Sequence, residues 1–169
     1  MKQQTDIENI TDLINRLTEK LDTMSVPIDE RKFSMDEYRK VFPRGSVKTP
    51  IGEVKIGKNQ FSKLAEKDNG KRQGLIGAMY QTLSDPIVII QEEENGRSAY
   101  IFIKSFKIDG KTDIIVSVVV TIEDQKVAIS TYKRKKREVI SKIKKAGVMT
   151  YEKSHGTSPT NGIDPPSLI

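Results

Sequence analysis

The segment from residue 87 to residue 132 constrains the fold more than any other part of the chain. Four β-prone runs follow one another there, at residues 87–91, 98–106, 113–122 and 126–132. Short turn sequences separate these runs: Asn95-Gly96, Asp109-Gly110 and Glu123-Asp124-Gln125. A parallel pair of strands needs a long crossover, so connections this short predict a four-stranded antiparallel meander.

Helical periodicity precedes the meander. Apolar residues recur at three- and four-residue spacing from Thr5 to about Met24, where Thr5 and Glu8 form a capping box and Pro27 is expected to end the helix. We expect this N-terminal helix to pack on the domain. Pairing with a partner helix and formation of a dimeric coil are left open.

Further elements follow from local signals. Ser34 with Glu37 forms a second capping box, which opens a short helix through Val41. Residues 46–56 predict a small hairpin around a turn-rich tripeptide, Pro50-Ile51-Gly52. Three more helices are expected, at residues 59–68, 72–83 and 134–146.

This order of elements predicts an α+β fold: N-terminal helices, then a four-stranded antiparallel meander sheet, then a basic C-terminal helix. The expected organisation has a helical extension at residues 1–44, one compact domain at 45–151 and a flexible tail at 152–169. One ordinary core is what a chain of 169 residues supports.

Positive charge is concentrated near the end of the chain. The net charge is +6, and residues 126–146 hold nine Lys and Arg against one acid, Glu138. The rest of the chain is therefore close to neutral. Clustering of this kind is expected for a protein that binds a polyanion, although a basic helix is equally often a solvated face.

Composition excludes several classes of protein. The chain lacks a long apolar run and an apolar N-terminus, so we expect a cytoplasmic protein. Zero Cys and one His argue against disulfides, thiolate nucleophiles and zinc sites. No phosphate-loop or dinucleotide motif is present, which argues against NTPases and oxidoreductases.

Acidic residues cluster near the turns, where we expect them to cap and solvate the chain. Neither a metal site nor a cofactor is expected from this group: Asp85, Asp109, Asp113, Glu123 and Asp124. The run Glu92-Glu93-Glu94 is expected to keep a hairpin tip soluble.

Metal-independent RNA chemistry stays open. The 2′-hydroxyl of RNA can attack its own phosphate, so the protein needs only to move protons and stabilise negative charge. Alternation along 98–106 places Tyr100 and Lys104 on one face, where they can stack a base and hold a phosphate. The competing interpretation is an aromatic-rich face covered by a helix.

Two further groups are candidates for RNA contacts. Ser130, Thr131 and Tyr132 end the last predicted strand just before the basic helix, and helix N-termini favour phosphate. These hydroxyls can equally serve as an N-cap. A second basic set surrounds the Asn69-Gly70 break and, taken alone, fits a solvated face: Lys63, Lys67, Lys71 and Arg72.

Several segments together resemble a known family. They are Lys58-Asn59-Gln60-Phe61 before a Lys-rich helix, Thr82-Leu83-Ser84-Asp85-Pro86-Ile87-Val88-Ile89, Tyr100-Ile101-Phe102-Ile103-Lys104, a valine-rich strand, and Val127-Ala128-Ile129-Ser130-Thr131 before a basic helix. This order resembles the phage-type barnase/EndoU/colicin E5-D/RelE-like (BECR fold) nuclease domains of phage and mobile-element proteins. The resemblance covers roughly residues 46–151.

The resemblance implies a barnase- or RelE-like ribonuclease fold, with helices on one face of the sheet and the active surface on the other. Carried over by position, it implies a set of catalytic residues: Lys67, Arg72, Lys104, Ser130 and Thr131. The expected RNA-binding residues are Lys63, Lys71, Tyr100, Tyr132, Lys133, Arg134, Lys136 and Arg137.

One departure from the family affects the expected chemistry. Many such nucleases use a His in the helical region, whereas the one His here is His155, in the predicted tail. Either Lys67 or Arg72 then stabilises charge beside a different base, or catalysis is weakened or lost; a role for His155 from the tail is also left open.

The leading hypothesis is a toxin-like, metal-independent ribonuclease directed at tRNA or mRNA. Its rival is a catalytically inactive RNA- or protein-binding module on the same fold, and a DNA-associated accessory protein is a third interpretation. An immunity or antitoxin protein as partner, and an oligomer through the N-terminal helix, are left open.

Overall fold

A computed structural model describes residues 9–28, 34–56, 75–94, 97–146 and 148–154. The described helices are α1 (Ile10–Thr23), α2 (Met35–Val41), the 3-10 turn η2 (Pro43–Gly45), α4 (Leu75–Ser84) and α5 (Lys136–Ala146). Within these ranges, no helix is long and apolar enough to cross a membrane.

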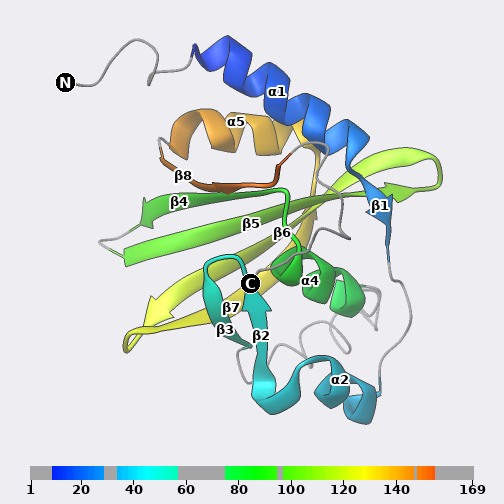
Figure 1. Cartoon of the computed structure of the whole chain (residues 1–169), viewed down its shortest axis with the longest axis vertical. Coiled ribbons are helices and arrows are strands. Elements are labelled where there is room, and N and C mark those ends of the chain that lie inside the picture. Colours follow the sequence, from blue (N-terminus) through cyan, green and yellow to red (C-terminus); the bar gives the residue numbers. More distant parts are fainter. Residues whose placement is uncertain (1–8, 29–33, 57–74, 95–96, 147, 155–169) are drawn as a thin grey trace.

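The strands of the described residues form one eight-stranded sheet. They are β1 (Val26–Pro27), β2 (Ser46–Thr49), β3 (Gly52–Ile56), β4 (Val88–Glu94), β5 (Arg97–Ile108), β6 (Lys111–Ile122), β7 (Gln125–Arg134) and β8 (Val148–Glu152). The order across the sheet is β2-β3-β7-β6-β5-β4-β8, and β1 pairs with β5 (Figure 1). The β3–β7 and β1–β5 pairs are parallel, and the others are antiparallel.

The α+β class is confirmed, but the prediction of a four-stranded sheet is wrong. The expected meander exists as β4 to β7 and forms the middle of a larger sheet. The predicted hairpin, β2–β3, adds to β7 through a parallel pair, and β8 adds to β4. Strand edges carry unpaired amide and carbonyl groups, so segments far away in sequence complete them.

Local signals fixed some helix ends and missed others. The Ser34 hydroxyl accepts from the Glu37 amide at 3.1 Å and the Glu37 carboxylate accepts from the Ser34 amide at 3.0 Å, which confirms that capping box. Helix α1 ends at Thr23, within one residue of the predicted end near Met24, and Pro27 lies in β1. Helix α5 begins at Lys136, since β7 continues to Arg134. The Thr5–Glu8 box and the predicted helix at 59–68 lie outside the described residues.

Both faces of the sheet are covered by helices. On one face, α4 packs Ile76, Met79 and Leu83 into a core with Ile89 and Phe102. On the other face, α1 and α5 lie side by side over the sheet (Figure 1). There, two leucines of α1 and two residues of α5 share one apolar cluster with the strands: Leu17, Leu21, Val139 and Ile143. The expectation of one helix-free face is therefore wrong.

Ion pairs join α1 to the end of β8. Lys20, which is 6% exposed, places its ammonium 2.6 Å from the Glu152 carboxylate and 2.7 Å from the Lys153 carbonyl. Arg16 donates two hydrogen bonds to the same carboxylate, each of 2.8 Å. Burial alone would raise the pKa of Glu152, but the hydrogen bonds and charges of Arg16 and Lys20 outweigh it and hold that pKa below its ordinary value.

We predict that this carboxylate makes folding sensitive to acid. Because the pKa of Glu152 is lower in the folded chain, its contribution is complete above the ordinary value of 4.5 and is lost as the pH falls through the folded value. Glu152→Gln should lower the free energy of unfolding near neutral pH by about 2–3 kcal/mol, because Lys20 loses its countercharge in a buried position.

Urea unfolding of the wild type and of Glu152→Gln between pH 7 and pH 3 checks this prediction. The difference between them should shrink toward pH 3. A difference that stays constant over the whole range would contradict the assignment.

Candidate active site

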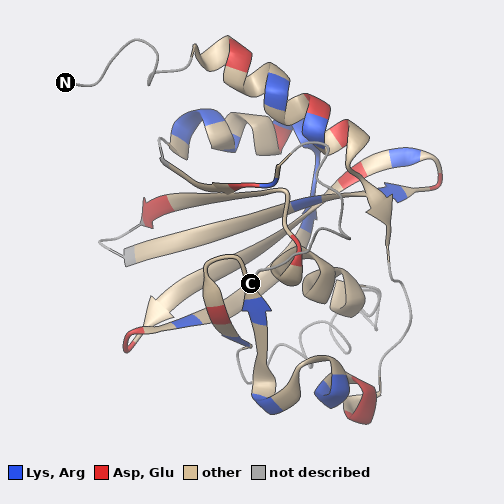
Figure 2. Ribbon diagram, viewed as in Figure 1, with Lys and Arg blue, Asp and Glu red and all other residues tan. Residues whose placement is uncertain are grey.

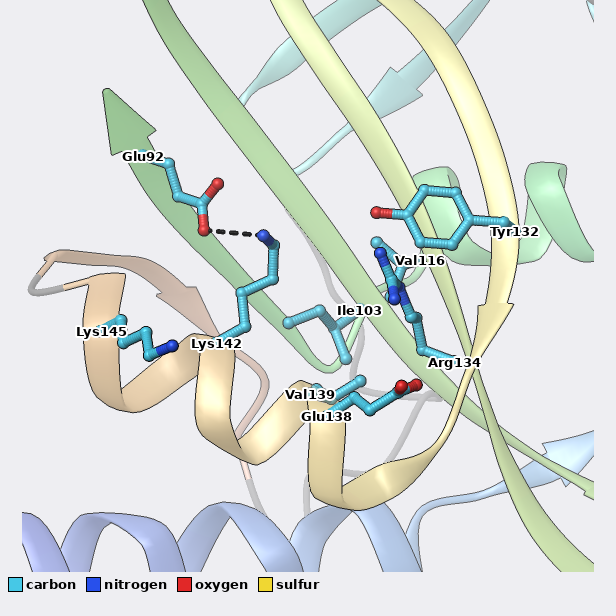
Figure 3. Close-up of a pocket in the computed structure, with 9 residues that line it drawn as sticks. All are labelled: Glu92, Ile103, Val116, Tyr132, Arg134, Glu138, Val139, Lys142 and Lys145. Atoms are coloured by element: carbon cyan, nitrogen blue, oxygen red, sulfur yellow. Dashed lines mark ion pairs between the residues drawn. The ribbon is translucent and has the colours of Figure 1, made fainter. Parts of the chain in front are cut away.

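A cavity of about 200 Å³ lies between α5 and the sheet. Strands β4, β5, β6 and β7 and helix α5 all contribute to its lining: Glu92, Ile103, Val116, Tyr132, Arg134, Glu138, Val139, Lys142 and Lys145. Figure 3 shows the charged and aromatic side chains pointing into the space above an apolar floor. The cavity combines carboxylates, cations and a phenol in one place.

Strand alternation and register place the sheet residues of this cavity. Glu92 lies on β4 on the same face as Val88 and Ile90, which belong to the core beneath α1 and α5. Tyr132 and Arg134 are two residues apart on β7, so both side chains point to that face. The pairs Ile103↔Val116 and Val116↔Tyr132 place the apolar floor directly beside the tyrosine.

Two charged groups of the cavity form an ion pair, and two others contact an aromatic ring and the backbone. The Lys142 ammonium lies 3.0 Å from the Glu92 carboxylate (Figure 3), and the Glu92 side chain is 22% exposed. The Arg134 guanidinium stacks over the Tyr132 ring at 4.8 Å from its centroid. The Glu138 carboxylate accepts a hydrogen bond of 3.1 Å from the Lys135 amide, so it caps the start of α5.

Such an arrangement is suited to a phosphodiester. Cations at the cavity can bind the phosphate and stabilise charge that develops on it, because interactions are stronger where water is partly excluded. A carboxylate such as Glu92 can accept a proton, and an aromatic ring paired with a guanidinium offers a surface for a base. Within the described ranges, no three His, Cys, Asp or Glu side chains are grouped to hold a metal ion.

The structure brings only part of the predicted site to this cavity. Tyr132 and Arg134 line it. Ser130 lies on the same face, one row further along β7, paired with Val118. Tyr132 and Arg134 were predicted as RNA-binding and Ser130 as catalytic, and these roles stay predictions.

Other predicted residues lie on the opposite face, beneath α4. The Lys104 side chain is 3% exposed; its ammonium donates to the Asp85 carbonyl at 2.6 Å and lies 3.1 Å from the Asp85 carboxylate. Burial lowers the pKa of Lys104, and the Asp85 charge opposes this shift. Thr131 is also buried, and its hydroxyl forms a 2.8 Å hydrogen bond with that of Ser117.

The remaining aromatic and basic candidates are dispersed. Strand register places Tyr100 and Lys133 on the α4 face. The centroid of the Tyr100 ring lies 6.0 Å from the Lys126 ammonium, and the Lys133 ammonium lies 4.0 Å from the Asp113 carboxylate. Lys136 forms a 2.8 Å ion pair with Asp22 of α1. Arg137 is exposed and lines a different hollow of α5. Lys63, Lys67, Lys71, Arg72 and His155 lie outside the described residues.

Sequence reasoning missed four charged residues of the cavity: Glu92, Glu138, Lys142 and Lys145. A signal for the first was present, because alternation from Val88 and Ile90 places Glu92 on an otherwise apolar face. The expectation that the acidic run only solubilises a hairpin tip overlooked this. The lysines gave no such signal, since every turn of the last helix is basic (Figure 2).

Comparison with known proteins gives one match. The model of a family described as phage-Barnase-EndoU-ColicinE5/D-RelE like nuclease2 matches residues 30–152. That range includes every residue that lines the cavity. No curated protein and no solved structure matches the chain.

We predict that Lys104 stabilises the fold. Lys104→Ala removes a buried ammonium and its two bonds to Asp85, and it leaves a cavity. The free energy of unfolding should therefore fall by about 2–4 kcal/mol. Lys133→Ala, an exposed control on the same face, should change it by less than about 0.5 kcal/mol. Urea unfolding at neutral pH measures both, and equal effects of the two substitutions would contradict the prediction.

Proposed function

Because the chain belongs to this phage-related family of barnase/EndoU/colicin E5-D/RelE-like nucleases, we propose that it is a metal-independent endoribonuclease whose active site is the cavity beneath α5. The observation that carries the proposal is the position of Glu92. A carboxylate lies on the sheet face, beside an ammonium 3.0 Å away and in a cavity that also holds Arg134 and Tyr132. We retain tRNA or mRNA as the proposed substrate.

Two further features support this location. Ile103, Val116 and Val139 form a buried apolar floor beneath the charged groups, and electrostatic interactions with a phosphate are stronger beside such a floor than in open water. Three cations reach the cavity, namely Arg134, Lys142 and Lys145, and two of them, Arg134 and Lys145, can each take one of the two non-bridging oxygens of the phosphate. Ser130 lies on the same face, two residues before Tyr132 on β7, and we keep for it the predicted role of orienting the phosphate.

The proposed reaction needs no group that the chain does not supply. The Glu92 carboxylate takes the proton of the 2′-hydroxyl while the 2′-oxygen forms a bond to phosphorus. Negative charge on the pentacoordinate phosphate is stabilised by Arg134 and Lys145. The bond to the 5′-oxygen then breaks, and that oxygen takes a proton from the Lys142 ammonium. Transfer of the first proton from Glu92 to Lys142 restores the starting pair.

The first test removes the proposed base. Glu92→Gln keeps the shape of the side chain but cannot accept the proton, so cleavage of total tRNA and of a structured mRNA in EDTA should fall by about 10²–10⁴-fold. Glu93→Gln is the matched control, because Glu93 is exposed and points to the other face. Equal cleavage by Glu92→Gln and Glu93→Gln would sink the assignment of the base.

A second test uses two lysines of one helix. Lys142→Met should reduce the cleavage rate by about 10²–10³-fold, because the proton donor to the leaving 5′-oxygen is lost. Lys144→Met removes an exposed lysine that lines a different hollow, so its effect on the rate should stay within about threefold. Similar losses in both variants would show a general effect of charge instead of a site.

The same experiment distinguishes the proposed ribonuclease from its rival, a binding module. Intact RNA with the wild-type protein in EDTA, together with a mobility shift that weakens as salt is added, would identify a binding module without catalysis. Cleavage that requires added Mg²⁺ would overturn metal independence while leaving nuclease activity in place.

A further inference from the structure

Helix α1 lies outside the residues that match the nuclease family, which begin at residue 30. It is nevertheless part of the core. Leu17 and Leu21 are fully buried and share an apolar cluster with Val139 and Ile143 of α5. The Ser105 hydroxyl, on β5, donates to the Leu21 carbonyl. Helix α1 is therefore held to both the sheet and α5.

Charged residues near the C-terminal end of α1 bind both ends of one downstream segment, which runs from Lys136 to Lys153. At one end, Asp22 forms a 2.8 Å ion pair with Lys136, the first residue of α5. At the other end, Lys20 lies 2.6 Å from Glu152 and 2.7 Å from the Lys153 carbonyl, at the end of β8. The segment between these points includes all of α5 and β8.

This segment, residues 136–152, carries one wall of the cavity. Glu138, Val139, Lys142 and Lys145 all lie between Lys136 and Glu152. The opposite wall belongs to β4, β5, β6 and β7, which are fixed by continuous strand pairing. The distance between Lys142 and Glu92 therefore depends on the position of α5, and α1, the blue helix in Figure 3, contacts α5 on the side away from the cavity.

We propose that α1 is a clamp that sets the position of the α5 wall, with Lys20 and Asp22 as positioning residues for the site. This inference rests on the proposed function. Neither residue lines the cavity. The contact made by Lys20 should stabilise α5 and β8 more than the one made by Asp22, because Lys20 is buried and bonds two groups at the end of β8. The Asp22 and Lys136 side chains are 44% and 38% exposed.

Hydrogen exchange tests the clamp without relying on activity. In Lys20→Met and Asp22→Asn, backbone amides of residues 136–146 should exchange at least about tenfold faster than in the wild type, because local opening of α5 becomes easier. Amides of β6, in the centre of the sheet, serve as the internal control and should keep their rates. Lys40→Met, which removes an exposed lysine of α2, is the matched substitution control.

RNA cleavage tests the link to the site. At a temperature where the variants are folded, kcat for Lys20→Met should fall about tenfold, and for Asp22→Asn less. In a Lys142→Met background, Lys20→Met should cause little further loss, because it acts through the wall that carries Lys142. A purely structural role would give losses that multiply.

Each outcome decides one point. Unchanged exchange of α5 in both folded variants overturns the clamp, and faster exchange with unchanged kcat overturns its link to the site. If Lys20→Met does not fold, Asp22→Asn carries the test alone. Absence of cleavage by the wild type overturns the proposed ribonuclease, and the exchange measurement then still decides whether α1 holds α5.

Discussion

Burial of both faces of the central strands is the constraint on which the rest of the structure depends. In β5, residues 101–106 are all buried, and so are residues 114–117 of β6. A sheet in that position needs an apolar layer on each side, which α4 supplies on one face and α1 with α5 on the other. Polar side chains in these strands must then bond inside the protein. Ser105, Lys104 and Ser117 do so, with α1, Asp85 and Thr131 respectively.

The same constraint explains where a site is available. A face that is covered completely offers no room for a substrate, so a cavity forms where a helix leaves the sheet partly uncovered. Between α5 and the sheet such a cavity remains: the buried side chains of Ile103 and Val116 are its floor, and Glu92 of β4 and Arg134 of β7 line it as well. Residues predicted from one strand alone, such as Lys104, instead fell on the layer beneath α4. The resemblance implied an open active face, whereas in the described residues helices cover both faces, and the site that we propose is the space between α5 and the sheet.

The residues that match the family and the residues that form the core do not begin at the same place in the chain. The family match starts at residue 30, yet α1 contributes two of the fully buried leucines of the chain. The expected division at residues 1–44, 45–151 and 152–169 stays a prediction, although α1 packs into the same core as the domain. Glu152, which opens the predicted tail, is also a strand residue with ionic partners on α1. Contacts between the two ends of the described chain thus make one structural unit.

The sequence by itself determined the class of the fold, the four long strands of the meander, the hairpin at 46–56 and the Ser34–Glu37 cap, because these depend on local periodicity and turn chemistry. It also indicated the nuclease family and two cavity residues, Tyr132 and Arg134. Only the tertiary structure decided which strands extend the sheet, which face each basic residue takes, and that Lys142 meets Glu92. Those pairings join residues far apart in the chain, and local pattern carries no information about such distances.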